Sequence, residues 1–218
     1  MEFIVINSLM VGSWKRANIN PLPNVDIPKA DSDCRGINVT PVIARAFEKV
    51  VYRTHVRRAV EESLSPTQFA YRQGGNYMNA SISIQPHVYK YLDNQDCNAV
   101  RIFTMDFSKA FDSPNHSILS AELKQLPLSP CIISWYHSIL LERQQRVSSG
   151  NHVCTWEAGN KGTTQGSVSG PYRFNVFLND LNIFHKDVLA LYKCADGSTI
   201  IAPVSSSSDP SDCLVKLF

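Results

Sequence analysis

The feature that most constrains the fold is a pair of apolar segments that flank a short turn near the C-terminal end. The segments are VLALYK, residues 188–193, and STIIAPV, residues 198–204, and Asp196 and Gly197 lie between them. An Asp-Gly pair between two β-prone runs is typical of a tight β-hairpin. The sequence therefore predicts a hairpin here, with the Asp196 carboxylate at its tip.

A third β-prone segment lies upstream of this hairpin. AVRIFTMDF, residues 99–107, is rich in β-branched and aromatic side chains and predicts a buried strand that ends near Asp106. If this strand neighbours the hairpin, Asp106 and Asp196 converge at one edge of the sheet. Carboxylate oxygens suit hard divalent cations such as magnesium, and a metal pair can assist an in-line displacement. Judged from the residues alone, a helix cap or a turn is the commoner role for each aspartate.

The rest of the chain predicts helices joined by polar loops. Residues 1–39 are expected to be irregular because prolines interrupt any periodicity. Thr40-Pro41 is expected to cap a helix through the 50s, with an apolar stripe that includes Ile43 and Phe47. Residues 76–92 also have a helical pattern, but Pro86 is expected to kink or break that helix. Further helices are expected from Ser113-Pro114 to about Leu126, over 131–142 and after the loop at 160–171, with a hairpin over 144–157 and a tail over 205–218.

The net charge and the composition exclude few classes of function. The formal net charge is +2, and 44% of the residues are hydrophobic, which is enough to bury a core. Six cysteines without a C-x-x-C pair argue against a zinc site, and no apolar stretch is long enough to span a membrane. A helical ridge of cations is either a solvated face or a strip that contacts phosphates; it comprises Arg45, Lys49, Arg53 and Arg57.

Several segments together resemble the reverse transcriptases of non-LTR (LINE-like) retrotransposons. FTMDFSKAFDSPNH is similar to the first palm motif of that family, and KGTTQGSVSGPYRFNVFLNDL is similar to the second. CADGSTIIA stands where the third motif, usually Tyr-Ala-Asp-Asp, is expected. DCRGINVTPVIARAFEKV and LSPTQFAYRQGG resemble the finger motifs, and the likeness runs from about Trp14 to Pro203.

The resemblance implies an α+β fold of the polymerase fingers-and-palm type. It has a mostly antiparallel palm sheet packed on helices, and the thumb is expected to be missing. The implied domains are an N-terminal extension (1–13), a fingers-like region (14–98), a palm region with the catalytic motifs (99–204) and a C-terminal tail (205–218).

The resemblance also assigns roles to individual residues. Asp106 and Asp196 take the positions of the catalytic carboxylates that bind two Mg²⁺ (or Mn²⁺) ions. Phe111 matches the residue that screens the sugar of the incoming nucleotide, and Gln165 and Gly166 match the lining of the nucleotide and template pocket. Arg72 and Arg35 of the fingers are implied to contact the triphosphate. A second set of cations is implied to contact the template or primer: Arg45, Lys49, Arg53 and Arg57.

The implied partners are an RNA template, a DNA primer, deoxynucleoside triphosphates and a full-length element protein, with no membrane. The implied residence is intracellular, in the cytoplasm or nucleus. Nucleic-acid binding without catalysis, and activity completed by a partner chain, stay as alternatives to an impaired polymerase.

This sequence departs from the family pattern at three positions. Cys194 stands where the family has Tyr, and Gly197 stands where it has the final Asp of the third motif. Losing one carboxylate is expected to weaken the two-metal site, so the chain is expected to be a truncated, degenerate copy with strongly impaired activity. Arg173 stands where the family places an apolar residue, and it is expected either to reach solvent or to disturb its helix.

Overall fold

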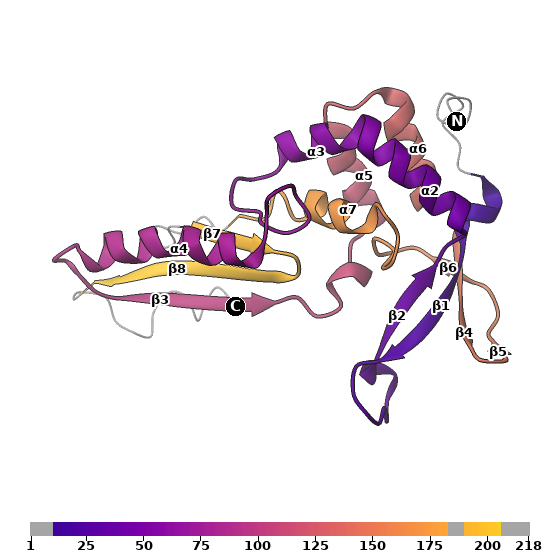
Figure 1. The fold of residues 1–218 in the computed structure, drawn as a ribbon, viewed down its shortest axis with the longest axis horizontal. Helices are drawn as coiled ribbons and strands as arrows, with labels where there is room; N and C mark the ends of the chain where they lie inside the picture. Colours follow the sequence, from indigo (N-terminus) through magenta and orange to yellow (C-terminus); the bar gives the residue numbers. More distant parts are fainter. Residues whose placement is uncertain (1–10, 183–189, 206–218) are drawn as a thin grey trace. The chain divides into compact units, whose positions relative to one another are not determined.

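The computed structural model describes residues 11–182 and 190–205 (Figure 1). The chain forms two compact units that are each discontinuous in sequence. Unit 1 comprises residues 1–64 and 109–178, and unit 2 comprises residues 65–108 and 179–218. Within the described ranges, no helix is both long enough and apolar enough to cross a membrane.

Unit 2 contains a three-stranded antiparallel sheet in the order β3-β8-β7 (Figure 1). The predicted hairpin is confirmed as β7 (Ala190–Cys194) and β8 (Gly197–Ser205), and β3 (Cys97–Asp106) confirms the predicted upstream strand. The expectation that β3 is buried was wrong. Among the described strands β3 pairs only with β8, so it lies at an edge of the sheet. Its side chains are half-buried or exposed, and that of Ile102 is 53% exposed. The buried centre is β8, where Ile200 and Ile201 are inaccessible to solvent.

Helix α4 (Tyr77–Leu92) packs on this sheet and begins at an Asn76 side chain that accepts the Asn79 N–H at 2.8 Å. The expected break at Pro86 was wrong, because the helix runs through it. A proline at that position offers no N–H to the carbonyl of Ile82, four residues earlier. A contact from the sheet stabilises the helical turn before Pro86, because the Tyr192 hydroxyl of β7 donates to the Ser83 carbonyl at 2.9 Å.

Replacing Pro86 with alanine is therefore expected to stabilise the chain. Alanine restores the missing helical hydrogen bond, and the free energy of unfolding should rise by about 2 kcal/mol. Urea denaturation measures the change, with Gln85→Ala, an exposed substitution in the same helix, as the control that should shift it by less than about 0.5 kcal/mol. A lower stability for Pro86→Ala would show that the proline is matched to a local bend.

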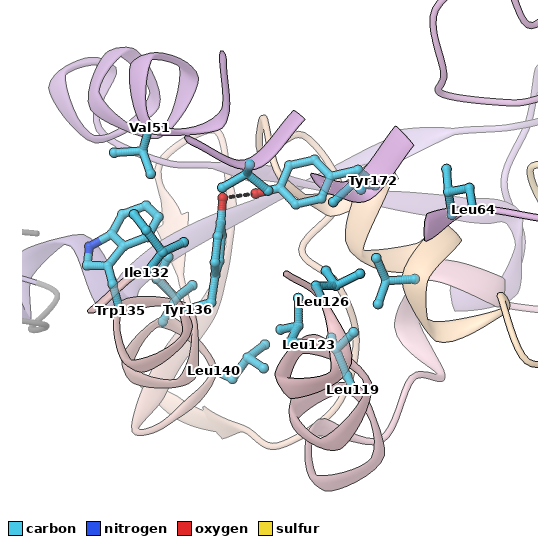
Figure 2. Close-up of a cluster of buried hydrophobic side chains, with 14 of the residues drawn as sticks. Val51, Leu64, Leu119, Leu123, Leu126, Ile132, Trp135, Tyr136, Leu140 and Tyr172 are labelled. Atoms are coloured by element: carbon cyan, nitrogen blue, oxygen red, sulfur yellow. Dashed lines mark hydrogen bonds between the residues drawn. The ribbon is translucent and has the colours of Figure 1, made fainter. Parts of the chain in front are cut away.

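Unit 1 is built around a core of helices (Figure 2). Helix α2 (Val42–Val51) continues through a π-helical turn, η3 (Tyr52–Val56), into α3 (Arg57–Ser63). Helices α5 (His116–Gln125), α6 (Pro130–Leu140) and α7 (Gly170–Phe177) complete the cluster. Its largest buried side chains include Trp135, Tyr136 and Tyr172, and the two tyrosine hydroxyls are hydrogen-bonded to each other, as Figure 2 shows.

Three details of the predicted helices were wrong. Helix α2 begins at Val42 after Pro41, and Thr40 is buried without acting as its cap. Its buried stripe consists of Ala44, Phe47, Glu48 and Val51, whereas the expected stripe member Ile43 is 72% exposed. The reason is that Phe47 packs edge-on against Trp135, with ring centroids 5.6 Å apart, which fixes the inward face. Helix α5 begins later than expected, because the Asn115 side chain accepts the Ser117 N–H at 2.8 Å.

Unit 1 also carries a sheet in the order β2-β1-β4-β5, with β6 paired to β4. Its strands are β1 (Arg16–Pro23), β2 (Cys34–Val39), β4 (Arg143–Ser149), β5 (His152–Val153) and β6 (Glu157–Gly159). The expectation that residues 1–39 are irregular was wrong for the residues of β1 and β2, and residues 1–10 lie outside the described part of the chain. The hairpin over 144–157 is confirmed by β4 and β5. The prolines of β1 are tolerated because β4 pairs only with residues 16–19, which leaves Pro21 and Pro23 beyond that pairing.

Candidate functional site

The structure places Asp106 and Asp196 at the same end of the sheet in unit 2. Asp106 is the last residue of β3 and pairs directly with Gly197, the first residue of β8. The Phe107 N–H donates to the Asp196 carbonyl at 3.1 Å, which ties the end of β3 to the hairpin turn. Asp106 is exposed and Asp196 is half-buried, so both carboxylates are accessible to a ligand from solvent.

The turn between β7 and β8 is tight, and Ala195 adopts a left-handed conformation with φ 57°. Burial, together with the nearby Asp196 carboxylate, raises the pKa of the Cys194 thiol. Gly197 is not required by the backbone, because a Cβ built there would lie 3.4 Å from the Cys194 carbonyl oxygen, an ordinary contact. Since cross-strand partners point to the same face, a side chain at position 197 would stand beside Asp106.

These residues fit a divalent cation only in part. Two carboxylates supply the oxygen ligands that magnesium and manganese prefer, and water and substrate phosphates can complete the shell. Across residues 11–182 and 190–205, however, no group of three or more His, Cys, Asp or Glu side chains is placed to hold a metal. Gly197, the cross-strand partner of Asp106, contributes no further carboxylate at this end of the sheet.

Phe111, Gln165 and Gly166 lie around one loop of unit 1. The Gln165 carbonyl accepts the Asn38 N–H at 3.0 Å, which joins the loop to β2. Gly166 has φ 91°, and a Cβ there would lie 2.8 Å from the Asn38 carbonyl oxygen, so only glycine fits. Phe111 lies in the short helix η4 (Ala110–Asp112), and its ring stacks on Phe174 of α7 with centroids 4.6 Å apart.

A buried acid, Glu48, holds the end of this loop. Its carboxylate accepts the N–H groups of Val168 at 3.1 Å and Ser169 at 3.2 Å, as well as the Ser169 hydroxyl. These donors lie directly before α7, where helical N–H groups lack intrahelical partners. The sequence prediction missed Glu48, although its spacing from Ala44 and Val51 places it on the buried stripe of α2.

Arg173 faces this acid from within α7. Burial raises the pKa of Glu48, while the positive charge of Arg173 acts in the opposite direction. Arg173 is inaccessible to solvent and donates through Nη2 to the Thr163 carbonyl at 3.2 Å. Its Nε and Nη1 atoms have no hydrogen-bond partner within the described part of the chain. The expectation that Arg173 reaches solvent or disturbs its helix was therefore wrong, because α7 forms around it.

A polar cavity of about 270 Å³ lies beside the same loop in unit 1. Asn38, Asp112 and Arg143 are among its lining residues. Burial lowers the pKa of Arg143 to about 10, and the nearby Arg173 adds to that shift. Burial raises the pKa of Asp112, whereas Lys109 and Arg35 oppose the shift. The Asp112 carboxyl group and the Arg143 guanidinium therefore belong to residues that line the same cavity.

The predicted basic residues differ in their surroundings. Arg72 donates from Nη1 to the carbonyls of Ser65 and Gln68, both at 3.2 Å, and so braces the loop before α4. Arg35 is exposed on β2. In the ridge, Arg57 binds Glu61 at 3.0 Å, whereas the other three cations are exposed: Arg45, Lys49 and Arg53. Contacts of these side chains with triphosphate or nucleic acid stay predictions.

The fold is similar to that of solved telomerase structures. Apo telomerase from Candida tropicalis matches with a TM-score of 0.62 and 14% identity, over 95% of this chain and 41% of that chain. Telomerase from Candida albicans in complex with a TWJ fragment of telomeric RNA matches with a TM-score of 0.59 and 10% identity, over 90% of this chain and 40% of that chain. The predicted α+β fingers-and-palm fold class is thereby confirmed.

Sequence comparison gives the same assignment. The chain is 28% identical over 190 residues to a probable RNA-directed DNA polymerase from transposon BS of Drosophila melanogaster. The match covers 82% of this chain and 20% of that relative, so the chain spans about a fifth of the length of the relative. The model of the reverse transcriptase (RNA-dependent DNA polymerase) family matches residues 27–198. The resemblance seen in the motifs is confirmed, and the chain belongs to the reverse transcriptase family.

Proposed function

We propose that this chain is the fingers-and-palm part of a transposon RNA-directed DNA polymerase in which nucleotide addition is strongly impaired. The observation that carries the proposal is the pairing of Asp106 with Gly197 at the end of β3. That pairing keeps Asp106 beside the turn that bears Asp196, and it leaves the adjacent position without a carboxylate. We also propose that the chain acts inside the cell, in the cytoplasm or nucleus, because RNA templates and deoxynucleotides are found there.

The proposed chemistry is nucleotidyl transfer to a DNA primer on an RNA template. Asp106 and Asp196 would hold Mg²⁺ or Mn²⁺, which when bound activates the attacking oxygen and stabilises the leaving one. The Phe111 ring, fixed by its stacking on Phe174, would exclude a 2′-hydroxyl and so select deoxynucleotides. Gly166, which has no side chain, would let a base approach the backbone of the loop.

Primer extension on an RNA template, with magnesium and then manganese, tests this proposal. We expect extension to be slow at best with manganese, and absent after Asp106→Asn, because the variant removes one of the two proposed charged ligands. Asp96→Asn is a matched control, because Asp96 is an exposed acid of the same unit outside the site. Extension at the rate of an efficient polymerase, about 1 per second or faster, would contradict the impairment. Extension that survives in Asp106→Asn would contradict the assignment of the site.

A second candidate function is nucleic-acid binding without catalysis, in which the fingers alone retain a template. The exposure of Arg45, Lys49 and Arg53 along one helical surface favours it. Binding of RNA should then weaken steeply with salt. No binding at low salt would remove this candidate. A full-length element protein that completes the chain is a further proposed partner, tested by adding it to the extension assay.

A further inference from the structure

The buried charges of unit 1 do not balance. The Glu48 carboxylate lies close enough to the guanidinium groups of Arg173 and Arg143 to interact electrostatically with both. Arg143 stays protonated at neutral pH, because its pKa is about 10 even after burial has lowered it. Two cations therefore surround at most one negative charge, and within the described part of the chain neither arginine forms an ion pair. Because a buried charge without a counterion is costly, this cluster favours an additional anion.

Arg143 connects this cluster to the polar cavity of about 270 Å³, which it lines. Among the described residues its guanidinium has no hydrogen-bond partner. Lys161, which is exposed, adds a second cation to the lining. Asp112 supplies the one carboxyl group of the lining, and burial raises its pKa, which favours the uncharged form. The lining residues therefore carry a net positive charge.

Side-chain amides surround the same cavity. Three of the lining residues carry one: Asn38, Gln145 and Asn160. Across residues 11–182 and 190–205, none of these three side chains has a hydrogen-bond partner. Each amide nitrogen can donate two hydrogen bonds, and the guanidinium can donate up to five. A cavity with this many free N–H donors and a net positive charge matches the oxygens of an anion.

The volume and the lining of the cavity limit what it can hold. Pockets for drug-sized ligands enclose about 300 to 1,000 Å³, so this smaller cavity suits an anion of a few heavy atoms rather than a nucleotide. The residues that the resemblance assigns to the nucleotide are not among those that line it: Phe111, Gln165, Gly166, Arg35 and Arg72. The cavity is therefore distinct from the nucleotide pocket of the proposed function.

We propose that this cavity binds a small oxyanion of the size of inorganic phosphate, through the Arg143 guanidinium and the side-chain amides around it. The anion supplies the negative charge that the cluster of Glu48, Arg143 and Arg173 lacks. A planar guanidinium can donate two parallel hydrogen bonds to a phosphate or a carboxylate, and both groups share this chemistry. The site goes beyond the proposed function, because it requires neither a metal nor a nucleic acid.

Isothermal titration calorimetry with inorganic phosphate tests the proposal, in EDTA and at constant ionic strength. Arg143→Gln should weaken phosphate binding at least about 10-fold, because it removes a charged hydrogen-bond donor from a half-buried position. Lys161→Gln should weaken binding only about 2-fold, since that cation is exposed. The matched control is Arg146→Gln, which removes a cation of the same strand that does not line the cavity and should leave the affinity unchanged.

Thermal unfolding checks that each variant is folded and gives a second measure of binding. Phosphate should raise the melting temperature of the starting chain and of Arg146→Gln, but not that of Arg143→Gln. Without phosphate, Arg143→Gln should melt no lower than the starting chain, because it removes a buried charge that has no counterion. Equal phosphate affinities of the two variants would overturn the proposal, as would no binding by the starting chain at about 10 mM phosphate.

Acetate and deoxyadenosine triphosphate, titrated in the same way, distinguish the possible sources of the oxyanion. Tighter binding of phosphate than of acetate, dependent on Arg143, assigns the site to phosphate groups, and the reverse order assigns it to carboxylates. Binding of the triphosphate that is tighter than that of phosphate and depends on Arg143 would overturn the proposal, because the cavity would then belong to the nucleotide pocket. Asp106→Asn should leave phosphate binding unchanged, so this proposal and the proposed polymerase function can fail independently.

Discussion

Gly197→Asp is expected to raise metal-dependent primer extension by about 10²- to 10³-fold, because it supplies the carboxylate that the site lacks. Gly197 is the direct cross-strand partner of Asp106, so the new side chain would stand on the same face at the same end of the sheet. The backbone permits it, since a Cβ at 197 makes only an ordinary contact with the Cys194 carbonyl oxygen at 3.4 Å.

Single-nucleotide extension with magnesium measures this gain, and Gly197→Asn is the matched control. Asparagine has the same shape as aspartate without its charge, so it should leave extension near the level of the starting chain. In the absence of metal, the added negative charge beside Asp106 should lower the melting temperature, and magnesium should restore it. Equal activities of the aspartate and asparagine variants would contradict a role for charge at this position.

Glu48→Ala is expected to lower the free energy of unfolding by about 3 to 5 kcal/mol, because it removes the buried acceptor of three hydrogen bonds and leaves their donors unsatisfied. Alanine leaves the N–H groups of Val168 and Ser169 without their acceptor. It also leaves the fully buried guanidinium of Arg173 without its nearby negative charge. The loop that carries Gln165 and Gly166 should loosen, because its far end is no longer fixed to α2.

Chemical denaturation measures the loss, and Glu62→Ala is the matched control. Glu62 lies on α3, where its exposed pair with Arg58 should contribute less than about 1 kcal/mol. Glu48→Ala/Arg173→Met should recover much of the stability, because the second substitution removes the uncompensated charge. A loss below about 1 kcal/mol for Glu48→Ala would show that Arg173 is stabilised by other groups.

Local patterns in the sequence were enough to predict the strands of unit 2. The Asp196-Gly197 turn between apolar runs predicted β7 and β8, and the run before Asp106 predicted β3. Strands β1 and β2 were missed because Pro21 and Pro23 interrupt the local pattern. Strand β1 pairs with β2 and also with β4, which lies more than 100 residues later in the sequence. The inward face of α2 likewise depends on Trp135, which no local pattern places against Phe47.

The residues of the candidate site also differ in whether the sequence alone could predict them. The family motifs identified Asp106 and Asp196, and the register of β3 with β8 places them at one end of the sheet. Glu48 was missed because its partners at Val168 and Ser169 are ~120 residues away in the sequence. Arg173 was judged by its type alone, whereas its environment depends on that same distant acid. The roles of Phe111 and the basic residues in binding substrate stay predictions.

The most direct test of the central claim, that Asp106 and Asp196 form one cation site, is a titration of Mn²⁺ followed by electron paramagnetic resonance. The titration compares the chain with Asp106→Asn, Asp196→Asn and the double variant. We expect each single substitution to weaken binding at least about 10-fold, and the double variant to be little weaker than either, because the two ligands act together. Unchanged affinity in either single variant, or independent losses that add in the double variant, would contradict the claim.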